Sequence, residues 1–417
     1  MKFKRFLPII ISLCILFSSC IQINAVNIEN YNHDVATLNE TNFLHLTKEQ
    51  LLEDYEYYWK IIKENSPLFA ASERINKISG KYEEYKHELL NSNSNLEQLE
   101  CIVKLSQCLI GHTGLFFDPK YGQQLYNTAD RQIWYKHLID PISEKNYNLY
   151  KLFRNKKLGY IVKSQKDVNE IYANCDNNIE TKIIKYNEIA YVKIKSFGSE
   201  YIEEDKPKLF DFYNKIGGYK NLIIDITGNS GGSTTYLYKN LLPLLTGKLS
   251  VKQYMLFKVG NKNREFIEEA FGNDNLKPIC GLPNFENLSE HDKKGMTHFF
   301  CAEFTQELEK QINFSGKIWI LIDGKVFSTS EALSINCKQT GCATLVGTNT
   351  SGDGIGCDPA LMVLPNSKLV FRYSLEYGLN SDGSSNAIFG TKPDIVSSEN
   401  ETPLETCLKT IYKSVWS

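Results

Sequence analysis

The pattern of apolar and polar positions divides the chain into a helical first part and a second part of alternating strands and helices. Between residues 47 and 109, apolar residues recur at helical spacing, which predicts three helices. The first begins at the capping box Thr47-x-x-Gln50 and ends at Ser66-Pro67, since the residue before a proline avoids helical geometry. The second spans about residues 72–90. The third begins near Asn95 and ends in Ile110-Gly111-His112-Thr113-Gly114.

From residue 189 onward, short apolar runs alternate with amphipathic segments. Such runs are too short for helices and are typical of buried strands. Their order (strand, helix, strand, glycine-rich loop, helix) predicts βαβ units in a parallel or mixed sheet. The predicted strands are 189–194, 222–226, 318–322 and 343–347, and the predicted helices are 205–216, 233–245 and 331–336. We expect a hairpin of 360–364 and 368–373 to complete this sheet, ahead of a last helix from Thr402-Pro403.

The stretch from Gly316 to Gly354 has the pattern of a nucleophile site. A buried strand, a turn at Asp323-Gly324 and a helix meet at Ser328-Thr329-Ser330. The unpaired N–H groups and the dipole of a helix N-terminus would stabilise an oxyanion that forms beside such a hydroxyl. The alternative is an ordinary Ser/Thr N-cap, which is the commoner reason for hydroxyl residues at a helix start.

Two further segments carry candidate chemistry, and each has a structural alternative. The loop Thr227-Gly-Asn-Ser-Gly-Gly232 lacks the ending of a P-loop and the spacing of a dinucleotide fingerprint. Its backbone N–H groups suit an oxyanion hole, and its glycines equally suit a tight turn. His112 stands between glycines after an apolar helix, so it can face a cleft or simply cap that helix.

Composition narrows the classes of function. The 417 residues carry a net charge of −2 without a long basic run, which argues against nucleic acid and against a polybasic membrane patch. The absence of a C-x-x-C motif or a histidine-rich cluster argues against a zinc site, and we expect no metal and no cofactor. Of the 11 cysteines, nine lie beyond Cys14 and Cys20, an odd number whose pairing the sequence does not give.

The N-terminus has the pattern of a targeting segment. A positive region at residues 2–5 precedes the apolar run Phe6–Phe17, which is shorter than the ~20 residues that span a bilayer. Ser18-Ser19-Cys20 resembles the lipobox of bacterial lipoproteins, with Phe17 where that pattern prefers leucine. We expect export and a lipid anchor on Cys20; the alternative is cleavage near Ala25 and secretion.

Four segments together resemble serine peptidases of family S41, the tail-specific or C-terminal-processing type related to the tricorn core protease. In the order that the family has, they are Ile110–Thr113, Leu222–Gly232, Val326–Ala332, and Ala343–Gly347 with Thr350–Gly352. The resemblance implies an α/β fold, with a mixed βαβ sheet catalytic domain of the ClpP/crotonase-like type and a helical N-terminal subdomain. It also implies a peptide or protein substrate. No segment between His112 and Ile189 resembles a PDZ module.

The resemblance assigns roles to the residues at two of these segments. It implies Ser328, three residues before Glu331, as the nucleophile. It implies the N–H of Thr329 and the backbone of Gly231 and Gly232 as the oxyanion hole.

The chain departs from the family pattern at two positions. Asp353 stands where members with a Ser–Lys dyad have lysine, and a carboxylate cannot serve as the amine base, so the base is expected to be His112. The late glutamate of some histidine-using members falls at Ala387. We therefore expect Glu376 to orient His112, with Asp353 as the second candidate. The alternative for Glu376 is a solvated carboxylate on a strand face.

These observations predict a signal segment at 1–20, a tether at 21–45, a helical subdomain at 46–117 and an α/β catalytic domain at 118–417, with an insertion around 247–315. The predicted function is an exported serine-type peptidase that forms an acyl-enzyme on Ser328 with His112 as general base. One alternative is a catalytically inactive S41-like lipoprotein that binds peptides or envelope components. The other is an esterase that uses the same site.

Overall fold

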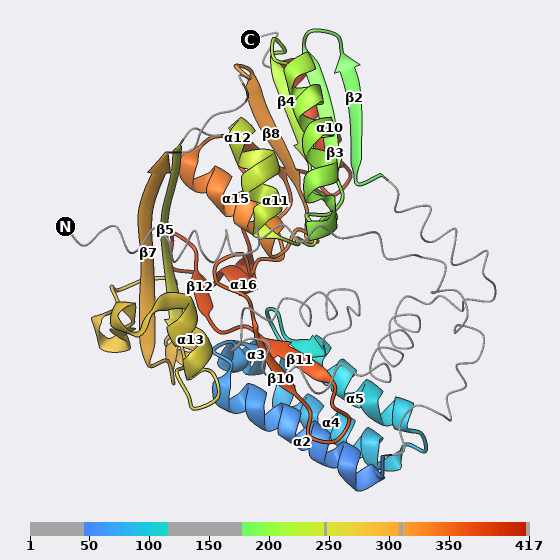
Figure 1. The fold of residues 1–417 in the computed structure, drawn as a ribbon, viewed down its shortest axis with the longest axis vertical. Helices are drawn as coiled ribbons and strands as arrows, with labels where there is room; N and C mark the ends of the chain where they lie inside the picture. Colours follow the sequence, from blue (N-terminus) through green and yellow to red (C-terminus); the bar gives the residue numbers. More distant parts are fainter. Residues whose placement is uncertain (1–45, 116–176, 246–247, 308–311, 313, 414–417) are drawn as a thin grey trace.

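The structure, a computed structural model, describes residues 46–115, 177–245, 248–307, 312 and 314–413 (Figure 1). The predicted targeting segment, Cys20 and the tether lie outside these residues, so they remain predictions. Among the described residues, no helix combines the length and the apolar character needed to cross a bilayer.

The larger sheet has six strands in the order β13-β9-β8-β4-β3-β2, and only β2 runs antiparallel to its neighbour. The strands are β2 (Ile179–Lys185), β3 (Ile189–Ile194), β4 (Asn221–Asp225), β8 (Lys317–Ile322), β9 (Thr344–Gly347) and β13 (Ile395–Val396). The four strands expected from the apolar runs are confirmed, and so is a mixed α/β fold.

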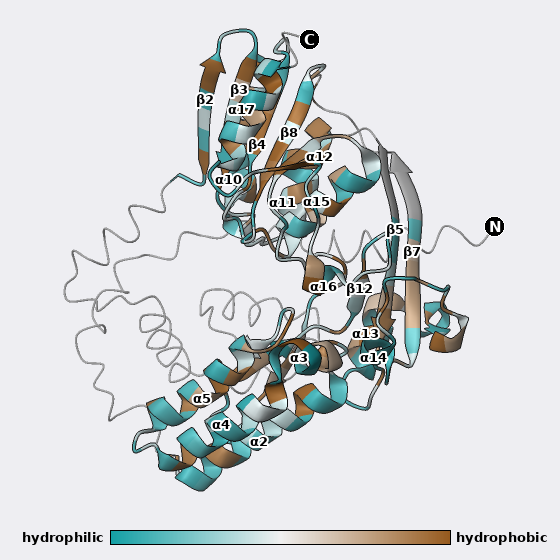
Figure 2. Cartoon of the chain, turned by 180° about the vertical axis from the view of Figure 1, so that it is seen from behind, coloured by the Kyte–Doolittle hydropathy of each residue, from teal (hydrophilic) through white to brown (hydrophobic). Residues whose placement is uncertain are grey.

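Both faces of this sheet are buried because successive strand residues point to opposite sides. Ile224 and Ile320 belong to one core, and their neighbours Ile223 and Trp319 belong to the other. Figure 2 shows β3 and β8 mainly in the hydrophobic colours. The first core is covered by α10 (Ile202–Lys215), by the run α11 (Thr234–Tyr236), η7 (Leu237–Leu241) and α12 (Leu242–Leu245), and by α15 (Thr329–Thr340). The second is covered by α17 (Pro403–Lys413).

The helical subdomain lies at the opposite end of the molecule from this sheet (Figure 1). Its helices are α2 (Lys48–Asn65), α3 (Phe69–Asn76), α4 (Ile78–Asn91) and α5 (Asn95–Gln107). The expectation of one helix over 72–90 is wrong, because Lys77 adopts a left-handed conformation (φ 52°, ψ 48°) and separates α3 from α4. The cap of α5 is Ser94.

The hairpin of β10 (Ala360–Val363) and β11 (Val370–Tyr373) forms as expected but does not join the large sheet. It forms a three-stranded sheet with β1 (Gly114–Leu115) and packs on the helical subdomain, with Phe371 edge-on to Tyr58 at 5.1 Å. The fully buried carboxylate of Asp54 on α2 accepts the backbone N–H groups of Asn366 and Ser367 at 2.8 Å each. The hairpin near the end of the chain is therefore bound to α2 and β1 near its beginning.

The third sheet, in the order β12-β5-β7-β6, connects the two ends of the molecule. It consists of β5 (Lys248–Phe257), β6 (Lys277–Pro278), β7 (His298–Glu307) and β12 (Tyr377–Leu379). Short helices η6 (Ser199–Tyr201), α13 (Arg264–Phe271), η8 (Asn273–Asn275), η9 (Ile279–Gly281), α14 (Glu290–Lys293) and α16 (Asn386–Phe389) complete the described chain. Arg74 of α3 holds the buried Asp292 of α14 in a bidentate ion pair, with N···O distances of 3.0 and 2.6 Å.

Candidate active site

Ser328 lies at the junction of β8 and α15 in a conformation that non-glycine residues rarely adopt, with φ 58° and ψ −125°. Its backbone is held there by a hydrogen bond from its own N–H to Gly352 O at 3.1 Å, and by one from Ala332 N–H to its carbonyl at 2.9 Å. Its side chain accepts no hydrogen bond from the helix. The ordinary N-cap alternative therefore does not describe Ser328, and its hydroxyl is available for other chemistry.

His112 is fixed by the carboxylate of Asp353, which lies 241 residues further along the chain. Asp353 Oδ2 accepts from the imidazole Nδ1 at 2.5 Å and from the backbone N–H of His112 at 2.7 Å. Because an ionised carboxylate only accepts hydrogen bonds, Nδ1 carries the proton and Nε2 remains as the basic nitrogen. The ring lies against Phe327, the residue before Ser328, with 4.5 Å between ring centroids.

The pKa of Asp353 results from opposing effects. Burial raises it, but the nearby charge of His112, the two hydrogen bonds from His112 and one from Ser374 Oγ lower it below the ordinary value of 3.8. The side chain of Asp353 is therefore an anion at neutral pH, despite being only 4% exposed. An anion in this place would stabilise the imidazolium that forms when His112 accepts a proton.

Glu376, the first candidate for the orienting acid, is not the carboxylate that the structure places on the His112 ring; Asp353, the second candidate, is. Glu376 lies between β11 and β12 and is only 4% exposed, so it is also not a solvated carboxylate on a strand face. Cys357 Sγ lies 3.6 Å from its Oε2, and within the described residues no hydrogen bond joins Glu376 to His112. Burial and the charge of Asp353 raise its pKa well above the ordinary value, which disfavours the charged form that an orienting acid needs.

The expected oxyanion groups surround Ser328, but the three are not equivalent. The N–H of Gly231 donates to Asn229 Oδ1 at 2.9 Å, so it is already engaged. A Cβ atom on Gly231 would lie 2.9 Å from Ser328 Cβ, which shows how closely this loop approaches the serine. Within the described residues, the N–H groups of Gly232 and Thr329 have no acceptor. These two are the available donors.

The structure does not join Ser328 Oγ to His112 by a hydrogen bond within the described part of the chain. The two residues meet through Phe327, whose ring contacts the imidazole and whose backbone bridges Gly352 beside Asp353. Catalytic hydrogen bonds are often long or misaligned in free enzymes and tighten when substrate binds. Ser328 and His112 therefore lie at one junction without a direct hydrogen bond between their side chains.

Asn229 is a site residue that the sequence analysis quoted only as part of a motif. Its fully buried side chain donates to Ile194 O at 3.1 Å, at the end of β3. Its Oδ1 accepts from Gly231 N and, at 2.7 Å, from the hydroxyl of Ser330. One amide therefore fixes the glycine loop relative to the helix that begins at Ser328.

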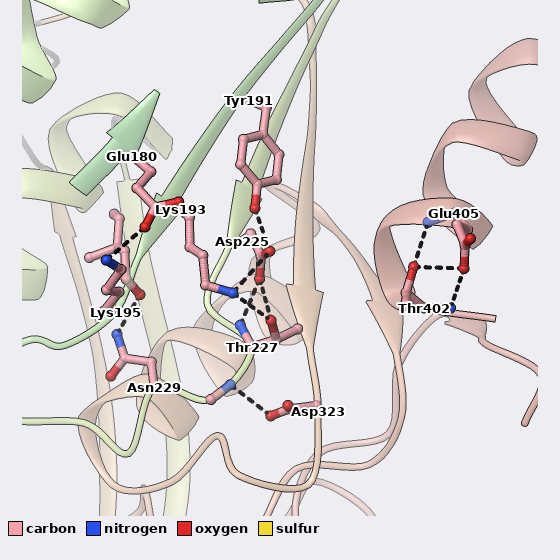
Figure 3. A network of polar contacts seen from close by, with 12 residues as sticks. Glu180, Tyr191, Lys193, Lys195, Asp225, Thr227, Asn229, Asp323, Thr402 and Glu405 are labelled. Atoms are coloured by element: carbon pink, nitrogen blue, oxygen red, sulfur yellow. Dashed lines mark hydrogen bonds and ion pairs between the residues drawn. The ribbon is translucent and has the colours of Figure 1, made fainter. Parts of the chain in front are cut away.

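A second polar network holds the start of the same loop (Figure 3). Asp225, at the end of β4, accepts from the Tyr191 hydroxyl at 2.7 Å and from both the N–H and the hydroxyl of Thr227. Lys193 Nζ lies 3.5 Å from Asp225 Oδ2 and 3.2 Å from Thr227 Oγ1. Asp323, after β8, accepts the N–H of Gly228 at 3.0 Å. The loop is therefore held by three neighbouring parallel strands.

Glu331, one turn into α15, holds the segment that carries Asp353. Its Oε1 accepts from Asn386 Nδ2 at 2.6 Å and from Thr391 Oγ1 at 2.7 Å. Asn386 in turn accepts the N–H of Gly354 at 2.9 Å, next to Asp353. Burial raises the pKa of Glu331 to about 7, and the charge of Asp353 adds to this, although hydrogen bonds from Thr350, Thr391 and Asn386 oppose it. Within the described residues, no group of three or more His, Cys, Asp or Glu is arranged to hold a metal ion.

Comparisons with known proteins identify the family and support the fold. The family model of Peptidase family S41 matches residues 188–397, which is half of the chain, and the chain belongs to this family of serine peptidases. No curated protein sequence matches it. A candidate peptidase from Parabacteroides merdae has a similar crystal structure, with a TM-score of 0.52 and 18% identity over 87% of this chain and 96% of that one.

A second similar structure is that of mature CPAF in complex with lactacystin. The TM-score is 0.52 and the identity is 13%, over 88% of this chain and 97% of CPAF. At these identities the two structures support the fold alone.

The close approach of Gly231 predicts a specific effect of adding a methyl group. Gly228 and Gly231 both have positive φ (81° and 100°), so Gly→Ala strains the backbone at either position. A Cβ at Gly228 meets nothing within 4 Å, but one at Gly231 lies 2.7 Å from Phe327 O. We expect Gly231→Ala to slow the labelling of Ser328 by a fluorophosphonate probe about 10²-fold relative to Gly228→Ala, through displacement of the serine. Equal labelling rates would contradict this account.

The raised pKa of Glu331 predicts a pH-dependent stability. The folded state holds this proton up to about pH 7, whereas the unfolded chain releases it near 4.5. The stability that Glu331 provides is therefore complete below pH 4.5 and declines as the pH rises through about 7. Glu331→Gln does not titrate, so between pH 5 and pH 8 the wild type should lose roughly 2–3 kcal/mol of unfolding free energy relative to this variant. Urea titrations at both pH values measure the difference, and parallel pH profiles would rule the effect out.

Proposed function

We propose that this chain cleaves peptide bonds through an acyl-enzyme on Ser328, with His112 as general base and Asp353 as the acid that orients it. The observation that carries the proposal is the hydrogen bond between His112 Nδ1 and Asp353, since it fixes the tautomer that leaves Nε2 basic. The membership in a serine peptidase family supports a peptide or protein substrate.

In the proposed reaction, Ser328 Oγ attacks the carbonyl carbon of the substrate and His112 Nε2 accepts its proton. The free N–H groups of Gly232 and Thr329 bind the oxyanion of the tetrahedral intermediate. One such donor commonly lowers the barrier by about 3 kcal/mol. The imidazolium, stabilised by Asp353, returns the proton to the leaving amine. Water then attacks the acyl-enzyme in the same way, with His112 accepting its proton, and the acyl group is released from Ser328.

The mechanism requires Ser328 Oγ and His112 Nε2 to approach each other in the substrate complex. The side chain of Ser328 makes no hydrogen bond in the described structure, so rotation about its Cα–Cβ bond breaks none. An extended peptide along a sheet edge would supply the binding energy for this closure.

A fluorophosphonate probe tests the proposal directly. We expect labelling of the wild type and its loss in Ser328→Ala and in His112→Ala, with peptide hydrolysis lost in parallel. Asp353→Asn should lower kcat/KM by about 10²–10⁴-fold, because the neutral amide no longer fixes the productive tautomer. The matched control is Glu376→Gln, which replaces another buried carboxyl group near Asp353 and should retain most of the activity.

Each alternative has its own outcome in this experiment. A wild type that is neither labelled nor active would favour the inactive peptide-binding lipoprotein. Labelling with turnover of small acyl esters but not of peptides would favour the esterase. A larger loss in Glu376→Gln than in Asp353→Asn would return the orienting role to Glu376.

We also propose that the protein is exported and anchored by a lipid on Cys20, a proposal that the sequence pattern of the N-terminal segment supports. In cell fractionation, the wild type should sediment with the membranes and Cys20→Ser should appear in the soluble or secreted fraction. The same distribution for both chains would exclude the anchor.

A further inference from the structure

The end of α15 brings two cysteines together. The helix ends at Thr340, and Gly341 follows in the left-handed conformation (φ 68°, ψ 15°), with its N–H donating to Cys337 O at 2.8 Å. In helix ends of this kind, the third residue before the helix end lies against the second residue after it. Cys337 and Cys342 occupy these two positions.

The two sulfur atoms are 3.7 Å apart. Cys337 is buried at 1% exposure, and Cys342 is partly exposed. Among the eight cysteines in the described part of the chain, these are the two whose sulfur atoms contact each other. The hydrogen bond with Cys337 lowers the pKa of Cys342 to about 7, so the accessible sulfur is also the better nucleophile near neutral pH.

We propose that Cys337 and Cys342 are a dithiol that closes to an intramolecular disulfide when the protein meets a low-molecular-weight disulfide such as oxidised glutathione. The sulfur atoms must approach from 3.7 Å to about 2.0 Å. Gly341 lies between the two cysteines. Its backbone can shift to bring the sulfur atoms together, because glycine is conformationally permissive and the position that a Cβ would occupy there has no atom within 4 Å.

The exchange proceeds in two steps. The thiolate of Cys342 attacks one sulfur of the oxidant, the S–S bond of the oxidant breaks, and one thiol leaves. Cys337 then loses its proton and attacks Cys342 Sγ in the mixed disulfide, which expels the second thiol. Two protein thiols are oxidised, the oxidant is reduced to two thiols, and these carry the two protons.

The disulfide would tie the end of α15 to the residues that lead into β9. The 12-residue helix places this end roughly 18 Å from Ser328, so the bond does not touch the reacting groups. Its effect is on the scaffold: it restricts the unfolded chain and prevents fraying of the helix that presents the serine. We expect the oxidised protein to melt about 2–5 °C higher than the reduced protein and to keep its reactivity at Ser328.

Lys338 makes the bond easy to detect, because trypsin cleaves between the two cysteines. The full-length protein is incubated with oxidised glutathione or with dithiothreitol, alkylated, digested and analysed by mass spectrometry. After oxidation we expect peptide 326–338 linked to peptide 339–368, and no linked peptide after reduction. The second peptide also contains Cys357, so the variants Cys342→Ser and Cys357→Ser serve as a matched pair.

The link should disappear in Cys342→Ser and persist in Cys357→Ser. A wild type whose Cys337 and Cys342 remain fully alkylated after oxidation would overturn the proposal. So would a link that survives in Cys342→Ser, since that bond would involve Cys357. A melting temperature unchanged by complete closure would overturn the stabilising role.

Discussion

The site depends on one set of hydrogen bonds between distant parts of the chain, those that Asp353 accepts from the ring and the backbone of His112. This geometry leaves no room for a side chain on Gly111, the residue before His112. A Cβ on Gly111 would lie 2.7 Å from Ser374 Oγ and 3.1 Å from Asp353 Oδ2. Asp353 itself has a positive φ of 56°. The helical subdomain and the α/β part therefore meet where Gly111 and Asp353 both have positive φ. The buried carboxylate of Asp353 joins the two segments through its hydrogen bonds to His112.

Burial and the available hydrogen-bond partners explain why the pKa of Asp353 is lowered and the pKa values of two neighbouring glutamates are raised. Asp353, Glu331 and Glu376 are all buried. Burial is the main cause that raises the pKa of both glutamates, and the charge of Asp353 adds to it. Asp353 alone has the imidazole as a partner. Burial disfavours the charged form of both glutamates, whereas the hydrogen bonds from His112 and Ser374 favour the charged form of Asp353.

Much of this was predictable from the sequence, and the failures have physical reasons. The strands of the large sheet were predictable because short β-branched runs between glycine-rich turns have few alternatives. The hairpin of β10 and β11 was assigned to the wrong layer, since apolar residues on both faces fit either sheet equally well. The break at Lys77 has no glycine or proline to mark it. The motifs predict Ser328, His112 and the glycine loop as site residues, and the structure brings them to one junction. Which carboxylate reaches His112 depends on a backbone conformation at Asp353 that spacing does not encode.

The pairing of β1 with β11 has a consequence for the timing of synthesis. Gly114 and Leu115 find their strand partners at Arg372 and Phe371, near the end of the chain. The strand next to the imidazole therefore has nothing to pair with until nearly nine-tenths of the polypeptide has left the ribosome. The β1–β11 pairing, and with it the contact between the two halves of the fold beside His112, can therefore form only late in synthesis.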